Sequence, residues 1–138
     1  MRIVLDTDVM FAAFHSGGGA SRQLLLELLD GKAHLLLSTT LLVEYEAVLT
    51  RPGNLAKFGI GEADVLAVLD DLAAIGTLVV IHNRWRTATA DPDDVLVAAI
   101  NGSADVIASF NLADMRVGAA SFGIAVERPR DVLRRLRQ

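Results

Sequence analysis

The stretch Ile3-Val4-Leu5-Asp6-Thr7-Asp8, near the start of the chain, places three apolar residues directly before an acid. A short apolar run without alternating polarity is typical of a strand that is buried on both faces of a parallel sheet. The charged residue that ends such a strand lies at the carboxyl edge of the sheet, where open α/β folds bind their ligands. This stretch therefore predicts the class of the fold and also one functional residue, Asp6.

Similar apolar runs recur along the chain, separated by segments with helical spacing of apolar residues. Further strands are predicted over residues 35–37, 78–81, 106–108 and 124–126. Helices are predicted over residues 21–29, 38–49, 62–75, 91–100 and 131–137. Residues 51–61 contain one Pro and three Gly and are predicted to be a loop or mobile arm. The pattern predicts a single three-layer α/β domain over residues 1–138, with a central, mostly parallel sheet of about five strands flanked by helices.

Composition narrows the class of protein. The chain has 138 residues, of which 52% are hydrophobic and 22% charged, so it can bury a core without covalent cross-links. It has no cysteine, which excludes disulfides, cysteine zinc sites and a thiol nucleophile. The apolar run at residues 3–5 is too short for a secretory signal, and no run reaches the roughly 18 residues of a membrane span. We therefore expect a cytoplasmic protein without a membrane segment.

The net charge constrains any role with nucleic acids. Seventeen acids against thirteen bases give a net charge of -4. An acidic protein has no overall attraction for a polyanion, since affinity for nucleic acid normally comes from Lys and Arg. Nucleic-acid chemistry would therefore need a local basic rim, or bound cations that reverse the sign of an acidic pocket.

Acidic and amide side chains gather at or near the ends of the predicted strands. They are Asp6 and Asp8 after the first strand, Glu44 in the helix after the second, Asp91, Asp93 and Asp94 at the start of the helix before the fourth, and Asn111 and Asp114 after the fourth. Clustered carboxylates repel one another unless a cation neutralises them. Hard oxygen ligands favour Mg²⁺ or Mn²⁺, which activate water and stabilise charge on a phosphoryl group. The arrangement favours metal-assisted phosphodiester hydrolysis.

Most of these residues also have a purely structural interpretation. The alternatives are a turn cap for Asp6, a solvated helix position for Glu44, a helix N-cap before Pro92 for Asp91, and an Asx turn for Asn111 with Asp114. Asp94 borders the apolar run Val95–Ala99, and a carboxylate in that position needs a partner. Pairing with a cation is the interpretation favoured for Asp94.

Four segments of the chain resemble the PIN-domain family, and within it the VapC-like toxins of toxin–antitoxin systems. These segments occur in the family's order and span essentially the whole chain. They are residues 3–9 (IVLDTDV), 41–49 (LLVEYEAVL), 91–94 (DPDD) and 104–114 (ADVIASFNLAD).

The resemblance implies that Asp6, Glu44 and Asp94 are acids of a Mg²⁺ or Mn²⁺ site, which Asp114 or Asn111 completes. Two positions depart from the family pattern. Asp8 stands where the first motif usually has Asn, so it is either a further candidate ligand or a hydrogen-bonding substitute at the edge of the core. Asn111 stands where many relatives carry an acid, so the fourth ligand stays open between Asn111 and Asp114.

The resemblance also implies an activity and partners. PIN-domain toxins hydrolyse RNA with metal-activated water and without a covalent intermediate. They commonly form homodimers, and a cognate antitoxin protein inhibits them by covering the site. The sequence therefore predicts a metal-dependent endoribonuclease whose substrate is RNA.

Two rival hypotheses come from the same residues. In the first, Asp6-Thr7-Asp8 is the nucleophile motif of a phosphatase resembling the haloacid dehalogenase group, with Ser38 after the second strand as its second motif. That chemistry needs a lysine by a late strand, and the only lysines are Lys32 and Lys57. In the second, the chain is a degenerate PIN fold that binds RNA or a protein without catalysis.

Two basic segments could contribute a local rim. One is the segment Arg84-Trp85-Arg86, for which a solvated loop with a buried Trp is the favoured interpretation. The other is the C-terminal segment with its five arginines, which could serve RNA or an acidic antitoxin segment, or could complement a helix dipole. These five are Arg128, Arg130, Arg134, Arg135 and Arg137.

Overall fold

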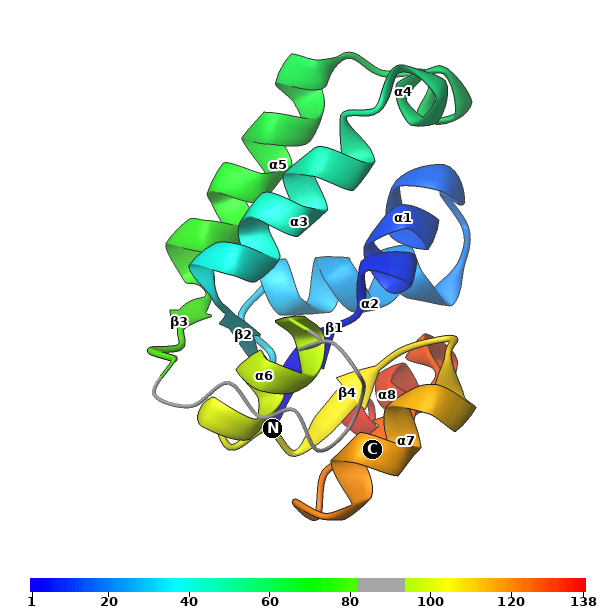
Figure 1. Ribbon diagram of the computed structural model, residues 1–138. Helices are drawn as coiled ribbons and strands as arrows, with labels where there is room; N and C mark the ends of the chain where they lie inside the picture. The colour runs from blue at the N-terminus through cyan, green and yellow to red at the C-terminus, as the bar shows by residue number, and fades with distance from the viewer. Residues whose placement is uncertain (82–93) are drawn as a thin grey trace.

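The computed structural model describes residues 1–81 and 94–138 and has a five-stranded sheet at its centre (Figure 1). The strands are β1 (Arg2–Leu5), β2 (His34–Leu37), β3 (Thr77–Leu78), β4 (Val106–Ala108) and β5 (Ala125–Glu127). Their order is β3-β2-β1-β4-β5, and every strand pair is parallel. The predicted three-layer α/β fold around a sheet of about five strands is confirmed.

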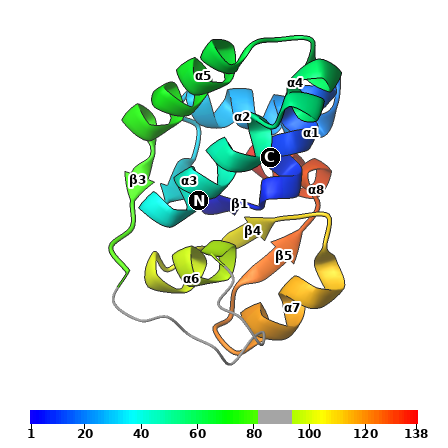
Figure 2. The same cartoon turned by 45° about the horizontal axis from the view of Figure 1, so that its top comes forward.

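Helices cover both faces of this sheet. They are α1 (Thr7–His15), α2 (Ala20–Leu29), α3 (Thr39–Leu49), α4 (Pro52–Phe58), α5 (Glu62–Ile75), α6 (Asp94–Asn101), α7 (Leu112–Ala120) and α8 (Pro129–Leu136). Helix α2 packs beside α8, whereas α6 packs against β1, β2 and β4 (Figure 2). The chain runs from β1 to β3 in one direction across the sheet and from β4 to β5 in the opposite direction. Right-handed crossovers therefore place the helices of the first connection and those of the second on opposite faces of the sheet.

The central strands are apolar along their length because helices cover both of their faces. Ile3, Val4 and Leu5 of β1 are at most 1% exposed, and β4 is buried at every position. Polarity cannot alternate in such a strand, because neither face meets water. No helix in the described part of the chain has the length and apolar character that crossing a bilayer requires.

Three helices, α1, α4 and α7, were not expected from the sequence. The loop predicted over residues 51–61 is wrong, because Pro52 occupies the first turn of α4 and Gly59, with a φ of 71°, ends that helix. Proline at a helix start and glycine in the left-handed conformation at its end are normal helix boundaries. Helix α1 begins directly after β1, with Asp6 as its N-cap.

Several boundaries also differ from the prediction. Strand β3 covers only Thr77–Leu78, and α2 begins at Ala20 after the N-cap Gly19, so Ser21 is not the cap. Helix α6 is described from Asp94 onward, and the predicted cap Asp91 lies outside the described residues.

The topology sets where a site can form. Strand β1 lies between β2 and β4, which the chain reaches by crossovers in opposite directions. Loops at such a switch point diverge from the carboxyl ends of the strands and leave room for a ligand. Leu5 of β1 is paired with Ala108 of β4, so Asp6 and Ser109 follow side by side at this edge.

Candidate active site

Asp6 is held at the end of β1 by contacts from two directions. Its Oδ1 accepts a hydrogen bond from the Thr7 backbone N–H (2.7 Å), which caps α1. Its Oδ2 accepts a hydrogen bond from the Ser109 hydroxyl (2.6 Å). The hydroxyl oxygen of Ser109, a fully buried residue, accepts in turn from the Asn111 backbone N–H (2.9 Å). The end of β4 therefore orients the carboxylate that ends β1.

We expect Ser109→Ala to lower the free energy of unfolding by about 1.5–3 kcal/mol, because a buried hydrogen bond to a charged acceptor is lost. Urea denaturation followed by circular dichroism measures this change. Ser121→Ala, at an exposed position after α7, is the matched control and should change stability by less than about 0.5 kcal/mol. Equal effects of the two substitutions would contradict the proposed role of Ser109.

Glu44 is brought to the same place from α3. Its Oε2 accepts a hydrogen bond from the Thr7 hydroxyl (2.7 Å), so Thr7 links Glu44 to the first turn of α1. The neighbouring Tyr45 is fully buried, and its hydroxyl donates to the Leu5 carbonyl. Burial raises the pKa of Tyr45 well above its ordinary value, and the negative charges of Asp6 and Glu44 raise it further. The carboxylates of Asp6 and Glu44 therefore both raise the pKa of the Tyr45 hydroxyl.

Asp8, on the first turn of α1, carries an incompletely satisfied carboxylate. Its Oδ2 accepts a hydrogen bond from the Phe110 backbone N–H (3.1 Å), whereas its buried Oδ1 has no hydrogen-bond partner among the described residues. Burial, followed by repulsion from Asp6, raises the pKa of Asp8 to about 6, against the opposing effect of nearby backbone N–H groups. Negative charge is therefore concentrated between β1 and β4.

We expect Asp8→Asn to stabilise the fold at neutral pH but not in acid. The folded-state pKa of about 6 exceeds the ordinary value of 3.8, so folding favours the protonated carboxyl. The resulting stabilisation is complete below the unfolded-state pKa and is lost as the pH rises through about 6. In chelator, the variant should melt at a higher temperature than the parent at about pH 7.5 and at the same temperature near pH 4. An unchanged melting temperature at both pH values would contradict this assignment, and exposed Asp71→Asn is the control.

The structure places the other predicted ligands on neighbouring elements. Asp94 begins α6, which packs against β1 and α3, and α6 also contacts α7. Asp114 lies exposed in the first turn of α7. Asn111 is the exposed N-cap residue of α7, but its side chain makes no capping hydrogen bond, so the Asx-turn alternative is not observed. Asp91 lies outside the described residues.

The candidate ligand side chains can be compared with the number and type of ligands that a divalent cation requires. Within residues 1–81 and 94–138, no three Asp, Glu or His side chains are grouped closely enough to hold a metal ion. The chemistry of the donors nevertheless suits a hard cation, because all of them are oxygen atoms and one buried carboxylate oxygen of Asp8 lacks a partner among the described residues. Asp6 repels Asp8, and Asp6 and Glu44 both act on Tyr45, so these three carboxylates interact within one region.

A comparison with protein-family models matches the PIN domain over residues 2–113, which is most of the chain. The chain belongs to the PIN-domain family. PIN domains are generally nucleases, so a hydrolase that acts on nucleic acid is the function that membership supports. Searches of curated proteins and of solved structures gave no significant match. The matched region of this PIN domain contains Asp6, Glu44, Asp94 and Asn111 and ends one residue before Asp114.

Three residues of this PIN domain's site were missed as functional candidates. Ser109 and Thr7 hold the carboxylates of Asp6 and Glu44, and Tyr45 joins α3 to the end of β1. All three lie within the PIN-like segments 3–9, 41–49 and 104–114. Thr7 directly follows Asp6 and Tyr45 directly follows Glu44, and a hydroxyl residue beside a candidate acid was the available signal, since buried carboxylates need donors.

Proposed function

We propose that this PIN domain is a metal-dependent endoribonuclease that hydrolyses RNA phosphodiester bonds with Mg²⁺ or Mn²⁺. The observation that supports this most directly is the gathering of negative charge where β1 and β4 end. There, repulsion from Asp6 contributes to the raised pKa of Asp8, and one Asp8 oxygen has no partner in the described part of the chain. A cation would offset this repulsion.

Asp6, Glu44 and Asp94 would hold the ion, with Asp114 or Asn111 as a fourth ligand and Asp8 and Asp91 as further candidates. A bound divalent cation activates water and stabilises the charge that develops on a phosphoryl group. The chain's own contribution is orientation. Ser109 and the Thr7 backbone hold the two oxygens of Asp6, while the Thr7 hydroxyl holds Glu44.

The proposal extends to a biological role as the toxin of a toxin–antitoxin pair. The order of the four family-like segments supports this role. It implies that the chain forms a homodimer and that a cognate antitoxin protein covers the acidic edge.

The test is cleavage of a labelled single-stranded RNA and of an RNA hairpin by the purified chain. We expect cleavage with Mg²⁺ or Mn²⁺ and none with EDTA, and the activity should return when excess Mn²⁺ is added. Cleavage that persists in EDTA would refute metal dependence.

A second candidate is a PIN fold that binds RNA or a partner protein without cleaving RNA. The observation that favours it is that no three acids or histidines of the described residues are grouped closely enough for a metal ion. Calorimetry with Mn²⁺ separates the two candidates. No heat of Mn²⁺ binding, together with no cleavage of either RNA, would establish the binding-only function over the nuclease.

A further inference from the structure

A cleft of about 500 Å³ lies beside the acidic edge. It is bordered by α1, by the start of α2, by the segment after β4 and by the start of α8. The lining residues that matter here are Ala12, Ser16, Ser21, Phe110, Arg128 and Arg130. The cleft thus combines apolar surface, an aromatic ring and two cations.

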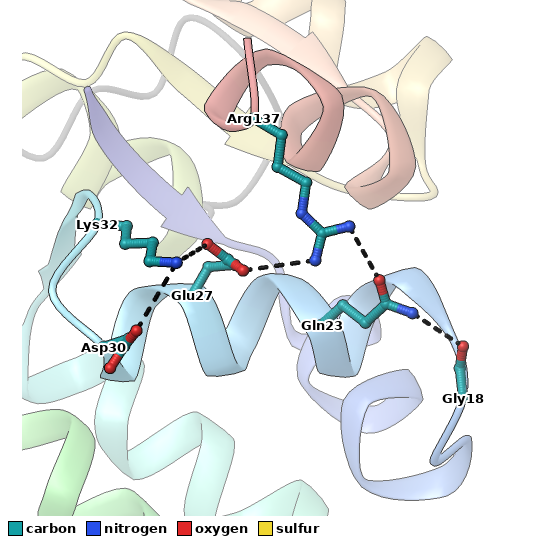
Figure 3. Close-up of polar contacts among 6 residues, drawn as sticks. All are labelled: Gly18, Gln23, Glu27, Asp30, Lys32 and Arg137. Carbon is teal, nitrogen blue, oxygen red and sulfur yellow. Dashed lines mark hydrogen bonds and ion pairs between the residues drawn. The ribbon is translucent and has the colours of Figure 1, made fainter.

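The two arginines of the cleft differ from the other arginines of the C-terminal segment. Arg134 pairs with Asp131 (3.6 Å), and Arg135 pairs with Glu127 (2.9 Å). Arg137 reaches Glu27 (3.4 Å) and Gln23 on α2 (Figure 3).

In contrast, Arg128 and Arg130 are exposed, and their side chains form no ion pair or hydrogen bond with any described residue. Two arginines that have no acidic partner in the described part of the chain and lie in one cleft are an anion-binding arrangement.

Two further side chains indicate what kind of anion fits. Phe110 is 48% exposed although it lies only two residues after the buried strand β4, so its ring is available as a stacking surface. Ser21 is only 5% exposed and also lines the cleft, so its hydroxyl can meet a polar group of a bound ligand. An aromatic face together with cations and a hydroxyl suits a nucleotide rather than a simple ion.

The cleft is continuous with the acidic edge. The Phe110 backbone N–H donates to Asp8 (3.1 Å), so the base of the Phe110 side chain adjoins the clustered carboxylates. On α1, Ala12 follows Asp8 by four residues and therefore lies on the same side of the helix, and Ser16 is the C-cap residue of that helix. One strand of nucleic acid can consequently contact both regions.

We propose that this cleft binds the single-stranded RNA segment that adjoins the scissile phosphate. A base stacks on Phe110, Arg128 and Arg130 bind phosphates, and the Ser21 hydroxyl donates to a phosphate oxygen. The position next to the scissile bond rests on the nuclease function proposed above. Single-stranded RNA is favoured because a base inside a duplex cannot present its face to the ring.

The test is fluorescence anisotropy with fluorescein-labelled oligouridylate of about eight nucleotides, in EDTA so that the RNA stays intact. We expect Arg128→Gln with Arg130→Gln to weaken binding by about ten-fold or more and to lower the slope of log Kd against log salt by about 1.4, since two phosphate contacts are lost. Phe110→Ala should weaken binding by about five-fold or more, whereas Phe110→Trp should bind as well as the parent chain.

The matched control is Arg134→Gln with Arg137→Gln, which removes the same charge from the same C-terminal segment. It should weaken binding by less than about three-fold, because these arginines are already paired with acids. Melting temperatures verify that each variant folds. If the glutamine pair does not fold, Arg128→Lys with Arg130→Lys takes its place and should retain most of the salt dependence.

Three results would overturn the proposal. The first is equal RNA binding by the control, the arginine pair and Phe110→Ala. The second is a preference for duplex RNA of the same length. The third is tighter binding of an oligoglutamate peptide than of RNA, which would assign the cleft to a protein partner.

The same experiments separate this proposal from the proposed activity. If the parent chain cleaves no RNA but the cleft variants lose RNA binding, the nuclease function is contradicted and the cleft remains an RNA-binding site. Metal-dependent cleavage with undiminished binding in these variants would contradict the cleft alone.

Discussion

Replacing Asp6 with asparagine should lower metal-dependent RNA cleavage by about a hundred-fold or more while the chain remains folded. Asparagine has nearly the same size and keeps an oxygen that can accept from the Thr7 backbone N–H. It lacks the negative charge that the proposed cation requires. The loss should therefore appear mainly in chemistry, with a smaller cost in stability because the Ser109 hydroxyl loses its charged acceptor.

Initial rates at saturating Mn²⁺ measure the first effect, and calorimetry measures the accompanying loss of Mn²⁺ affinity. Asp71→Asn makes the same change at an exposed position on α5 and should leave both unchanged. If Asp6→Asn cleaved RNA at more than about a tenth of the parent rate, Asp6 would not be an essential ligand.

Tyr45→Ala should lower the free energy of unfolding by about 3–5 kcal/mol, the largest effect on stability that we predict. The ring is fully buried in the core, and its removal leaves a cavity between α3 and β1. Tyr45→Phe keeps the ring but removes the donor to the Leu5 carbonyl, so it should lower the free energy by about 1–3 kcal/mol.

Urea denaturation followed by circular dichroism gives both values. Val43→Ala, at a 60% exposed position of the same helix, should change stability by less than about 0.5 kcal/mol. A Tyr45→Ala chain as stable as the Val43→Ala chain would show that the Tyr45 ring does not support the end of β1.

The buried strands could be predicted because their signal is local. Residues 3–5, 35–37 and 106–108 are short apolar runs, and the structure places a parallel strand at each. Helix α4 could not be predicted in the same way. Pro52 and Gly59 were interpreted as loop residues, although both are also ordinary helix boundaries, and composition alone does not separate these uses.

Asp6, Glu44 and Asp94 could be proposed as site residues from the sequence, because each follows an apolar run or borders one. The residues that orient these acids could not be recognised from the sequence, since their role depends on pairing between distant strands. Ser109 reaches Asp6 only because Leu5 and Ala108 are paired in register between β1 and β4. Phe110 and the arginines at the start of α8 also lie near α2 because of long-range packing. The spacing of residues along the sequence does not indicate that these segments are close in space.

The position of β1 in the sheet has a consequence during protein synthesis. Asp6 and the serine that orients it are 103 residues apart, so the first strand leaves the ribosome long before its neighbour β4 exists. Contacts this distant in sequence form late in folding, because the intervening chain must first be closed into a loop. A nascent chain that ends before β4 cannot complete the acidic edge. If the protein degrades RNA, it is therefore inactive until β4 has been translated and has left the ribosome.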